Sequence, residues 1–361
     1  MVSEASGDGA SGAAPSARFE SLGLKVPGKR LSSEELMAST KHKTRIELER
    51  LTGIHERHIV SGGEDSLKLA IGAAQDCLEH SRHSAADIEM LISCSISKYT
   101  RHYQHRLEPP LSLYIKEEIG APQALNFDVS NACAGMATGV FLLNNFIRRG
   151  EIKRGMVVSG EDISQLGVNA AKQVRTVLSK QLASLTLGDA GAAVMVEAAP
   201  EGAPGIDIAG FTTLAKHSRL CLAYPSMIGP GASMYTNSRG IQSAAIADAP
   251  YLIREALEQS GLEYGEIDYS IPHQTSARAI RKARKAFAER LGDSPKETII
   301  NVEEFGNTSS TTHFVALYRN LKDGRFAKGD RIMLLALASG LEIGVIIFTM
   351  DDLVERYGHA A

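Results

Sequence analysis

Short apolar runs alternate with amphipathic stretches along this chain, and one such series of elements occurs twice. Residues 77–92 align with residues 256–271 without a gap, and the identical positions include Leu78 with Leu257. Each copy has the pattern of the end of an amphipathic helix, a short turn and a buried strand. The repeat predicts that the chain consists of two related halves.

Each copy is followed by a turn of small residues that opens a helix, and then by a second apolar strand. The turns are residues 131–135 and 306–310, and the closing strands are residues 155–160 and 330–337. Strands that alternate with helices are typical of largely parallel sheets with helices on their faces. We therefore predict an α/β fold with the active site between two halves. The predicted boundaries are a disordered tail (1–17), an N-terminal half (18–200), a C-terminal half (201–352) and a second tail (353–361).

Composition narrows the class of protein without naming a function. The chain has 361 residues, 43% hydrophobic content, 22% charged residues and a net charge of -3, which describes a soluble globular protein. No charge pattern typical of nucleic-acid or membrane binding occurs, and no apolar run reaches the roughly 18 residues that cross a bilayer. The basic run 278–285 is interpreted either as the solvated face of a helix or as a docking patch for an acidic carrier protein or a nucleotide phosphate.

The four cysteines lie far apart, with neither a CxxC pair nor a metal-ligand spacing. We therefore expect free thiols in a reducing cytoplasm and no metal. Cys133 stands out because it follows an apolar strand pattern and opens a helical one. Peptide dipoles at a helix N-terminus favour negative charge, which predicts a lowered pKa and a nucleophilic thiol. The alternative is a buried cysteine that packs as a small hydrophobe.

A thiolate nucleophile needs a partner group, and the second half offers two candidates at predicted strand ends. His273 follows an apolar strand, and Asn307 follows Gly306 in the turn that corresponds to the cysteine turn. An oriented histidine and a second polar group beside a cysteine are typical of nucleophilic catalysis. We therefore predict a catalytic centre of Cys133, His273 and Asn307.

Three segments together resemble a known family. Asn131-Ala132-Cys133-Ala134-Gly135, Pro272-His273-Gln274 and Phe305-Gly306-Asn307-Thr308-Ser309 are similar to the active-site motifs of the ketoacyl-acyl-carrier-protein synthase III group of the thiolase superfamily. Two lesser matches agree, at residues 51–57 and 187–193. The resemblance implies the thiolase fold, with two duplicated βαβαβ-type halves in a five-layered α-β-α-β-α arrangement, and a homodimer.

The resemblance also implies a reaction and a role for each residue. Cys133 would accept an acyl group from a coenzyme A or acyl-carrier-protein thioester, and no further cofactor would be needed. His273 and Asn307 would donate hydrogen bonds to the thioester oxygen of the second substrate. The backbone amides of Cys133 and Gly340 would form the oxyanion hole. The implied function is Claisen condensation of acyl thioesters, in fatty-acid-derived or polyketide-type biosynthesis.

Two departures from the family pattern matter. The chain has no tryptophan, whereas ordinary members of the group place one near the position of Leu36 to stack on adenine, so the nucleotide-binding residues stay unknown. Glu108, followed by two prolines, resembles instead the olefin-pathway condensing enzymes, whose glutamate reaches the partner subunit's active site as a base. An acyl thioester without a carboxyl group to lose needs such a base. The alternative is a surface glutamate on a loop.

Other functions stay open on the same residues. Cys133 could pass its acyl group to an alcohol or an amine, a double condensation could close a cyclic dione or resorcinol, or the chain could be a scaffold that only binds an acyl carrier. We expect His102, His105 and His313 to be structural, and His313 to point away from Asn307 on a shared helix. The polar run 308–312 is expected to cap that helix or to contact a polar second substrate.

Overall fold

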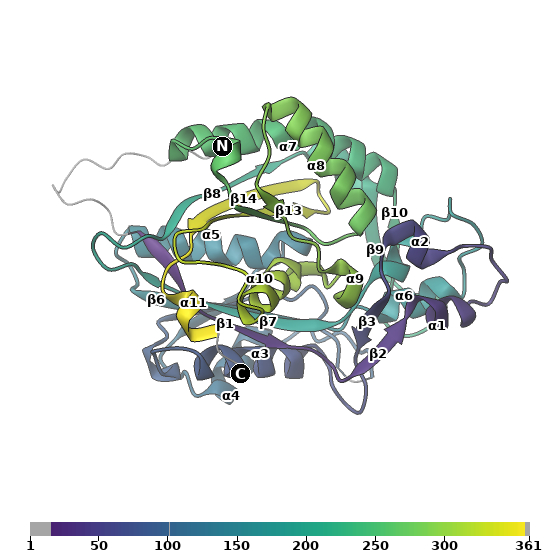
Figure 1. Ribbon diagram of the computed structural model, residues 1–361. Helices are drawn as coiled ribbons and strands as arrows, with labels where there is room; N and C mark the ends of the chain where they lie inside the picture. Colours follow the sequence, from purple (N-terminus) through teal and green to yellow (C-terminus); the bar gives the residue numbers. More distant parts are fainter. Residues whose placement is uncertain (1–15, 101, 358–361) are drawn as a thin grey trace.

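The computed structural model describes residues 16–100 and 102–357 and contains two five-stranded sheets (Figure 1). The strand pairs β4–β5 and β4–β6 of the first sheet are parallel, whereas β1 and β7 are antiparallel to their neighbours. In spatial order, the strands of this sheet are β1 (Ala17–Lys25), β7 (Ala190–Ala198), β6 (Arg154–Glu161), β4 (Met90–Ser93) and β5 (Leu125–Asp128).

The second sheet repeats the strand order and the directions of the first. Its β11 pairs in parallel with β12 and β13, and β14 and β8 complete it in antiparallel fashion. The predicted duplication is therefore confirmed, because each strand has a counterpart at the same place in the other sheet. In spatial order, the strands are β12 (Glu297–Thr298), β11 (Tyr269–Pro272), β13 (Arg331–Ala338), β14 (Glu342–Thr349) and β8 (Ile206–Thr213).

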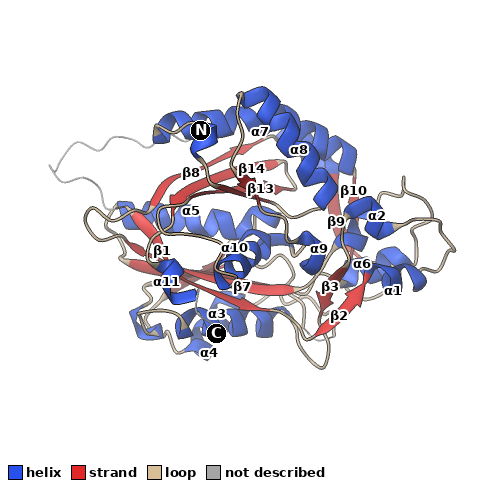
Figure 2. Ribbon diagram, in the orientation of Figure 1, coloured by secondary structure: helices blue, strands red, loops and turns tan. Residues whose placement is uncertain are grey.

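Helices cover both sheets and fill the space between them, which gives the five-layered α-β-α-β-α arrangement (Figures 1 and 2). The predicted α/β fold class is confirmed. The helices that form the three helical layers are α3 (Ser66–Glu79) and α4 (Leu111–Ile119) outside the first sheet, α5 (Gly135–Arg148) and α10 (Thr312–Lys322) between the sheets, and α7 (Ser238–Ser260) and α8 (Ala277–Leu291) outside the second.

Local sequence explains how these helices begin and why one of them lies so close to its sheet. The side chains of Asp65 and Ser276 accept hydrogen bonds from backbone N–H groups in the first turns of α3 and α8. Glycines on three strands face α3, and a Cβ at Gly160 or Gly191 would lie 2.0 or 2.1 Å from a backbone oxygen of that helix. Only glycine allows this approach, so α3 packs backbone to backbone on the sheet.

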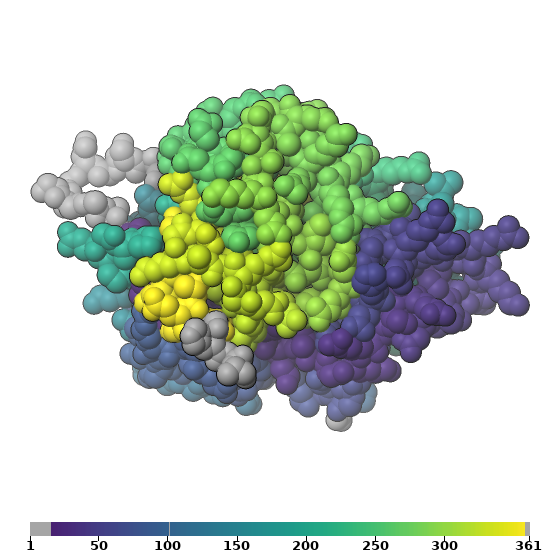
Figure 3. Space-filling view, viewed as in Figure 1, coloured from purple at the N-terminus to yellow at the C-terminus, as the bar shows by residue number. Residues whose placement is uncertain are grey.

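The largest core lies between the two sheets and joins the halves. It is built from buried apolar residues of both sheets together with α5 and α10, and Phe19 of β1 packs edge-on against Phe314 of α10 and Phe348 of β14. Separate apolar cores lie under α3 and α4 and under α7 and α8. Figure 3 shows the green and yellow atoms of the second half lying directly against the purple and blue atoms of the first. The interface between the halves is thus the main hydrophobic layer of the protein.

The remaining elements are short, and most of them lie at one end of this layered body, whereas α11 lies beside β1 (Figure 1). Two small antiparallel pairs, β2 with β3 and β9 with β10, lie outside the main sheets. Within the described residues, no helix is long and apolar enough to span a membrane. The bounds of the short elements are β2 (Lys29–Ser32), β3 (Glu56–Ile59), β9 (Cys221–Pro225), β10 (Ala232–Thr236), α1 (Ser33–Ala38), α2 (Leu48–Thr52), α6 (Gln165–Ala171), α9 (Val302–Phe305) and α11 (Leu353–Tyr357).

The two predicted tails have different outcomes. Most of the segment 1–17, predicted to be disordered, lies outside the described residues, and β1 begins at Ala17. The prediction of a tail from residue 353 onward is wrong for its first part, because Leu353–Tyr357 form α11.

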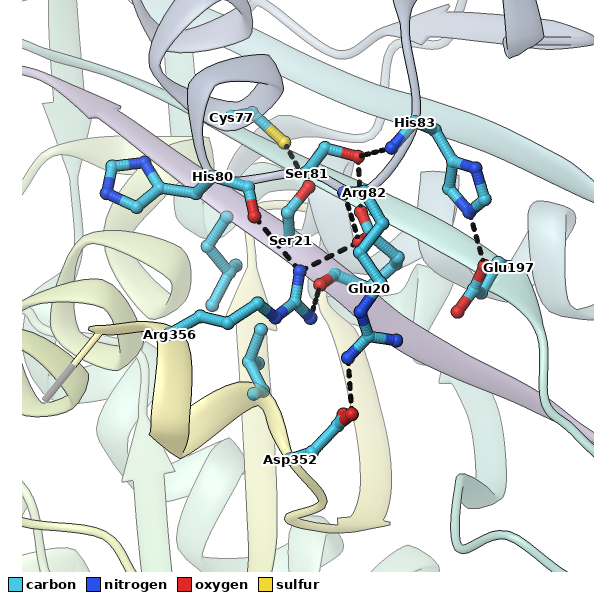
Figure 4. A network of polar contacts seen from close by, with 12 residues as sticks. Glu20, Ser21, Cys77, His80, Ser81, Arg82, His83, Glu197, Asp352 and Arg356 are labelled. Atoms are coloured by element: carbon cyan, nitrogen blue, oxygen red, sulfur yellow. Dashed lines mark hydrogen bonds and ion pairs between the residues drawn. The ribbon is translucent and has the colours of Figure 1, made fainter.

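Polar contacts hold α11 against the open side of the edge strand β1 (Figure 4). Arg356 donates to the buried carboxylate of Glu20 at 2.7 Å, and the Tyr357 hydroxyl accepts from the backbone N–H of Leu22 at 2.6 Å. Backbone groups on an open sheet edge need such partners. The C-terminal helix therefore covers the edge of the first sheet.

Candidate active site

Cys133 lies between the end of the edge strand β5 and the start of a helix, as predicted. A single 3-10 turn, η2 (Ala132–Ala134), joins β5 to α5, and Ala132 has a left-handed φ of 45°. Asp128, the last residue of β5, accepts from Lys98 Nζ at 2.6 Å and from the first backbone N–H groups of α4. The turn that presents the thiol is therefore anchored at its base, and the cysteine is half-buried.

The predicted direction of the Cys133 pKa is wrong. Burial raises the pKa of the Cys133 thiol to about 12, with further upward contributions from Cys221 and Glu161, and a hydrogen bond with Ser309 works in the opposite direction. Removing a charged group from water costs more than one helix end returns. The resting cysteine is a neutral thiol.

Asn307 is held by three hydrogen bonds that fix both its backbone and its amide oxygen. Its N–H donates to Thr186 O at 2.8 Å, its carbonyl accepts from Gly188 N at 3.0 Å, and its Oδ1 accepts from Ser309 N at 3.0 Å. No side-chain or backbone group in residues 16–100 and 102–357 pairs with its Nδ2. The side chain is thereby oriented as a hydrogen-bond donor.

His273 follows β11 directly, and its ring lies against that of His313, with ring centroids 5.8 Å apart. His313 was expected to point away from Asn307 on a shared helix, but the two residues do not share one. The helix α10 begins only at Thr312, after the 3-10 turn η6 (Ser309–Thr311), so helical spacing cannot be counted from Asn307. Leu335 O accepts from His273 N at 3.0 Å and lies 3.1 Å from His313 Nε2, which holds both residues on β13.

Burial also sets the protonation state of these two histidines. It lowers the pKa of His273 to about 3, with a smaller contribution from His313, and it lowers the pKa of His313 to about 4. A buried imidazole without a carboxylate partner resists taking up a proton. Both rings are therefore neutral at ordinary pH.

The polar run after Asn307 connects the three predicted motifs. Ser309 Oγ lies 3.6 Å from Cys133 Sγ, and Thr312 Oγ1 accepts from the backbone N–H of Gln274, next to His273, at 3.3 Å. Neither η6 nor α10 has a side-chain cap, so the capping role expected for the buried run 308–312 is wrong, whereas contact with a second substrate stays a prediction. The run is instead the junction at which the cysteine and histidine segments meet.

Glu108 and Gly340 lie in turns at the border of this region. Glu108 is exposed, beside Leu107 with 79% of its surface exposed, in the loop that leads to α4. Gly340 lies in the turn between β13 and β14, and both of these strands contact η2. The strands on both sides of Gly340 thus meet the cysteine turn, whereas Glu108 is exposed to solvent.

Leu36 cannot stack on a nucleotide, because it is buried with 5% exposure in an apolar cluster with Ile46 and Leu48. A cavity of ≈ 440 Å³ lies nearby, lined by Lys41, His42, Lys172, Gln173, Arg175 and Ile228. Its three lysine and arginine side chains have no carboxylate partner in the part of the chain that the structure describes. Sequence reasoning missed this cavity, and the only signal was the gathering of basic residues in two irregular segments.

Other candidate residues lie apart from these motifs. The basic run on α8 is exposed, and its Arg281 pairs with Glu303 at 2.9 Å. His105 contacts the ring of Tyr99, and within the described residues no group of histidine, cysteine and carboxylate side chains could hold a metal ion.

Comparison with known proteins identifies the family of this arrangement. The model of 3-oxoacyl-[acyl-carrier-protein] synthase III matches residues 127–216, and the model of its C-terminal region matches residues 257–350. Together they span about half of the chain and contain Cys133, His273, Asn307 and Gly340. The chain belongs to the 3-oxoacyl-[acyl-carrier-protein] synthase III family.

Individual members of the synthase III family and related structures agree over nearly the whole length. Beta-ketoacyl-[acyl-carrier-protein] synthase III of Deinococcus deserti is 29% identical over 339 residues, which cover 91% of each chain. The crystal structure of the Aquifex aeolicus synthase III superposes with a TM-score of 0.78 at 24% identity, covering 92% of this chain and 99% of that one.

A cysteine-to-serine variant of OleA from Xanthomonas campestris, with bound lauric acid and lauroyl-CoA, superposes with a TM-score of 0.80 at 23% identity, covering 93% of this chain and 99% of that one. These solved structures show that the fold is the thiolase fold. The protein is a synthase III-like condensing enzyme.

Proposed function

We propose that this protein forms a carbon–carbon bond by Claisen condensation of two acyl thioesters, through an acyl group held on Cys133. The observation that carries the proposal is the 307–313 segment, which orients Asn307 as a donor and contacts both Cys133 and the ring of His273. A nucleophile and two neutral donors on one buried junction are the groups that this reaction needs. The products would belong to fatty-acid-derived or polyketide-type biosynthesis.

The neutral state of His273 suits a role as a donor rather than as a cation. A neutral imidazole carries one N–H, which can point at the thioester oxygen of the second substrate while negative charge develops there. Asn307 supplies the second donor from Nδ2. In the preceding step, acyl transfer to Cys133, the backbone amides of Cys133 and Gly340 would stabilise the negative charge on the thioester oxygen of the first substrate.

The basic cavity supports a phosphate-bearing thioester as the acyl donor. Coenzyme A and the phosphopantetheine arm of an acyl carrier protein both carry phosphate groups, and unpaired Lys41, Lys172 and Arg175 offer charge-assisted hydrogen bonds to them. We expect the double variant Lys172→Ala/Arg175→Ala to raise KM for the donor about tenfold or more, with kcat nearly unchanged. A control variant, Lys216→Ala on the separate turn before β9, should leave KM unchanged.

Glu108 would act in a homodimer. β5 is the open edge of the first sheet and exposes Leu125 (61%), and its last residue, Asp128, binds the start of α4 directly after the Glu108 loop. A second copy that paired along β5 would therefore meet this loop. We propose that the loop enters the partner's site and that Glu108 removes the α-proton of the second acyl chain.

Mass spectrometry of the protein after incubation with a panel of acyl thioesters tests the proposal. We expect an acyl mass on Cys133, no such mass on a Cys133→Ala variant, and a ketone after addition of a second thioester. An ester or amide product would show acyl transfer instead of condensation. If no thioester acylates the protein, the enzymatic proposal is wrong.

The role of Glu108 has its own test. Condensation of unactivated acyl thioesters should fall by at least about 100-fold in Glu108→Ala, because a positioned base contributes that much. Decarboxylative condensation of a malonyl thioester should be unchanged in the same variant. Glu118→Ala, on the exposed face of α4, is the matched control and should affect neither reaction. Equal loss of both reactions in Glu108→Ala would contradict a role as base.

A further inference from the structure

Ser309 is buried beside the nucleophile Cys133, and it has no role in the proposed condensation. Its Oγ lies 3.6 Å from Cys133 Sγ, its side chain has 2% exposure, and its N–H donates to Asn307 Oδ1. Its φ of 60° is in the left-handed region, which residues other than glycine rarely adopt. Such a conformation persists only where the surrounding structure holds it.

The group that holds this turn is Glu161, at the end of β6. Its carboxylate is fully buried and accepts from the backbone N–H groups of Ile96 and Ser97, each at 2.9 Å. It also accepts from the hydroxyl of Ser310, the neighbour of Ser309 in η6. A buried carboxylate that accepts this many hydrogen bonds is held in one position. Glu161 thereby ties the turn that carries Ser309 to the central strand of the first sheet.

We propose that Ser309 is a catalytic residue of acyl transfer, whose hydroxyl donates a hydrogen bond to the Cys133 sulfur as negative charge develops on that atom. Glu161 is the residue that positions Ser309. The inference rests on the proposed function, because it assumes that Cys133 is the nucleophile. It adds to that function a donor to sulfur, whereas His273 and Asn307 serve the substrate oxygen.

The surroundings of Cys133 explain why such a donor is needed. Burial opposes the thiolate, and the two nearby imidazoles are neutral, so neither of them supplies a positive charge. In acyl transfer, the S–H bond of Cys133 is replaced by a bond from sulfur to the acyl carbon, while the thioester bond of the donor breaks. The thiol proton leaves on the sulfur of the carrier, and Ser309 keeps its own proton throughout. The Ser309 hydroxyl stabilises only the negative charge that the Cys133 sulfur carries during the transfer.

Alkylation of Cys133 by iodoacetamide measures this contact without any acyl substrate. We expect Ser309→Ala to slow alkylation about tenfold between about pH 7 and 9, since one hydrogen bond to a charged group is worth about one pKa unit. Ser309→Gly should show the same loss, and it also relieves the left-handed backbone in case the alanine variant folds poorly. Ser21→Ala is the matched control, because Ser21 pairs with the buried Cys77 at 3.2 Å far from the site.

A second comparison tests Glu161 as a positioning residue. Glu161→Gln also removes a charge that raises the Cys133 pKa, so the test is the effect of Ser309→Ala within the Glu161→Gln background. There Ser309→Ala should slow alkylation much less than in the wild type, because the hydroxyl has already lost its positioning. An equal slowing in both backgrounds would overturn the role of Glu161. Wild-type alkylation rates in both Ser309→Ala and Ser309→Gly would overturn the role of Ser309. Failure of every thioester to acylate the wild-type protein would instead refute the proposed function, and the alkylation rates would still report on Ser309.

Discussion

Acidification should destabilise this protein through its two buried histidines. His273 and His313 have folded pKa values of about 3 and about 4, against 6.5 for an ordinary histidine. As the pH falls below 6.5, the unfolded chain takes up protons that the folded protein refuses. The stability contributed by the neutral rings is therefore complete above pH 6.5 and is lost progressively down to the folded values.

The size of the effect follows from these values. Between pH 7 and pH 5 each histidine should remove about 2 kcal/mol from the free energy of unfolding. The two losses together are a large share of the roughly 5–15 kcal/mol that stabilises a typical domain. Burial raises the pKa of Glu161 and Asp189, so these carboxyls contribute with the opposite sign. A variant is therefore needed to isolate the histidine contribution.

His313→Gln is that variant, because glutamine keeps a donor for Leu335 O and does not titrate. The chain has no tryptophan, so urea unfolding would be followed by circular dichroism at pH 7 and pH 5. We expect the variant to lose about 2 kcal/mol less than the wild type over this interval. His55→Gln, at an exposed position, should behave as the wild type. Parallel losses in the wild type and His313→Gln would refute the reasoning.

Three further changes have expected outcomes. Gly188→Ala would place a Cβ 2.3 Å from Phe305 O, so we expect a loss of about 1–3 kcal/mol or more in thermal unfolding; an unchanged Tm would contradict the packing. Arg356→Met should cost about 3–5 kcal/mol in urea unfolding by leaving the Glu20 carboxylate buried and unpaired, and Glu20→Gln in the same chain should restore part of it. Asn307→Asp replaces a donor with a negative charge, so condensation should fall by about 100-fold or more while acylation of Cys133 persists; loss of both steps would place Asn307 elsewhere in the reaction.

The repeated order of elements was the part of the fold most open to prediction. Buried strands such as residues 90–93 and 269–272 follow amphipathic helices at matching positions, and hydrophobic spacing alone reports that order. Helix α11 could not be predicted in this way, since its five residues are shorter than any periodic signal. Its position depends on Arg356 and Tyr357 finding partners on β1, which lies more than 300 residues earlier in the chain.

The candidate site also has features that could be predicted from local sequence and features that depend on the tertiary structure. Cys133, His273 and Asn307 could be selected from the sequence because each matches a family motif. Cys133 and His273 also follow strands, whereas the strand end predicted before Asn307 is wrong, because the helix α9 precedes it. Their catalytic roles stay predictions. The protonation states could not be foreseen, because they depend on burial between two sheets rather than on local sequence. The helix expected to carry both Asn307 and His313 was wrong for a related reason, since a 3-10 turn of three residues separates Asn307 from α10.

The contact of 3.6 Å between the cysteine turn and the asparagine turn joins one half of the chain to the other. Behind it lies the shared core, where Phe19 of the first half meets Phe314 of the second with ring centroids 6.2 Å apart. The two halves therefore cannot change their relative position without also separating the sulfur from its neighbours. A substitution that repacks the core between the two halves would therefore displace the catalytic groups even where the protein still folds. In evolutionary terms, residues of this core are subject to the same selection as the catalytic groups, although they lie far from the substrate.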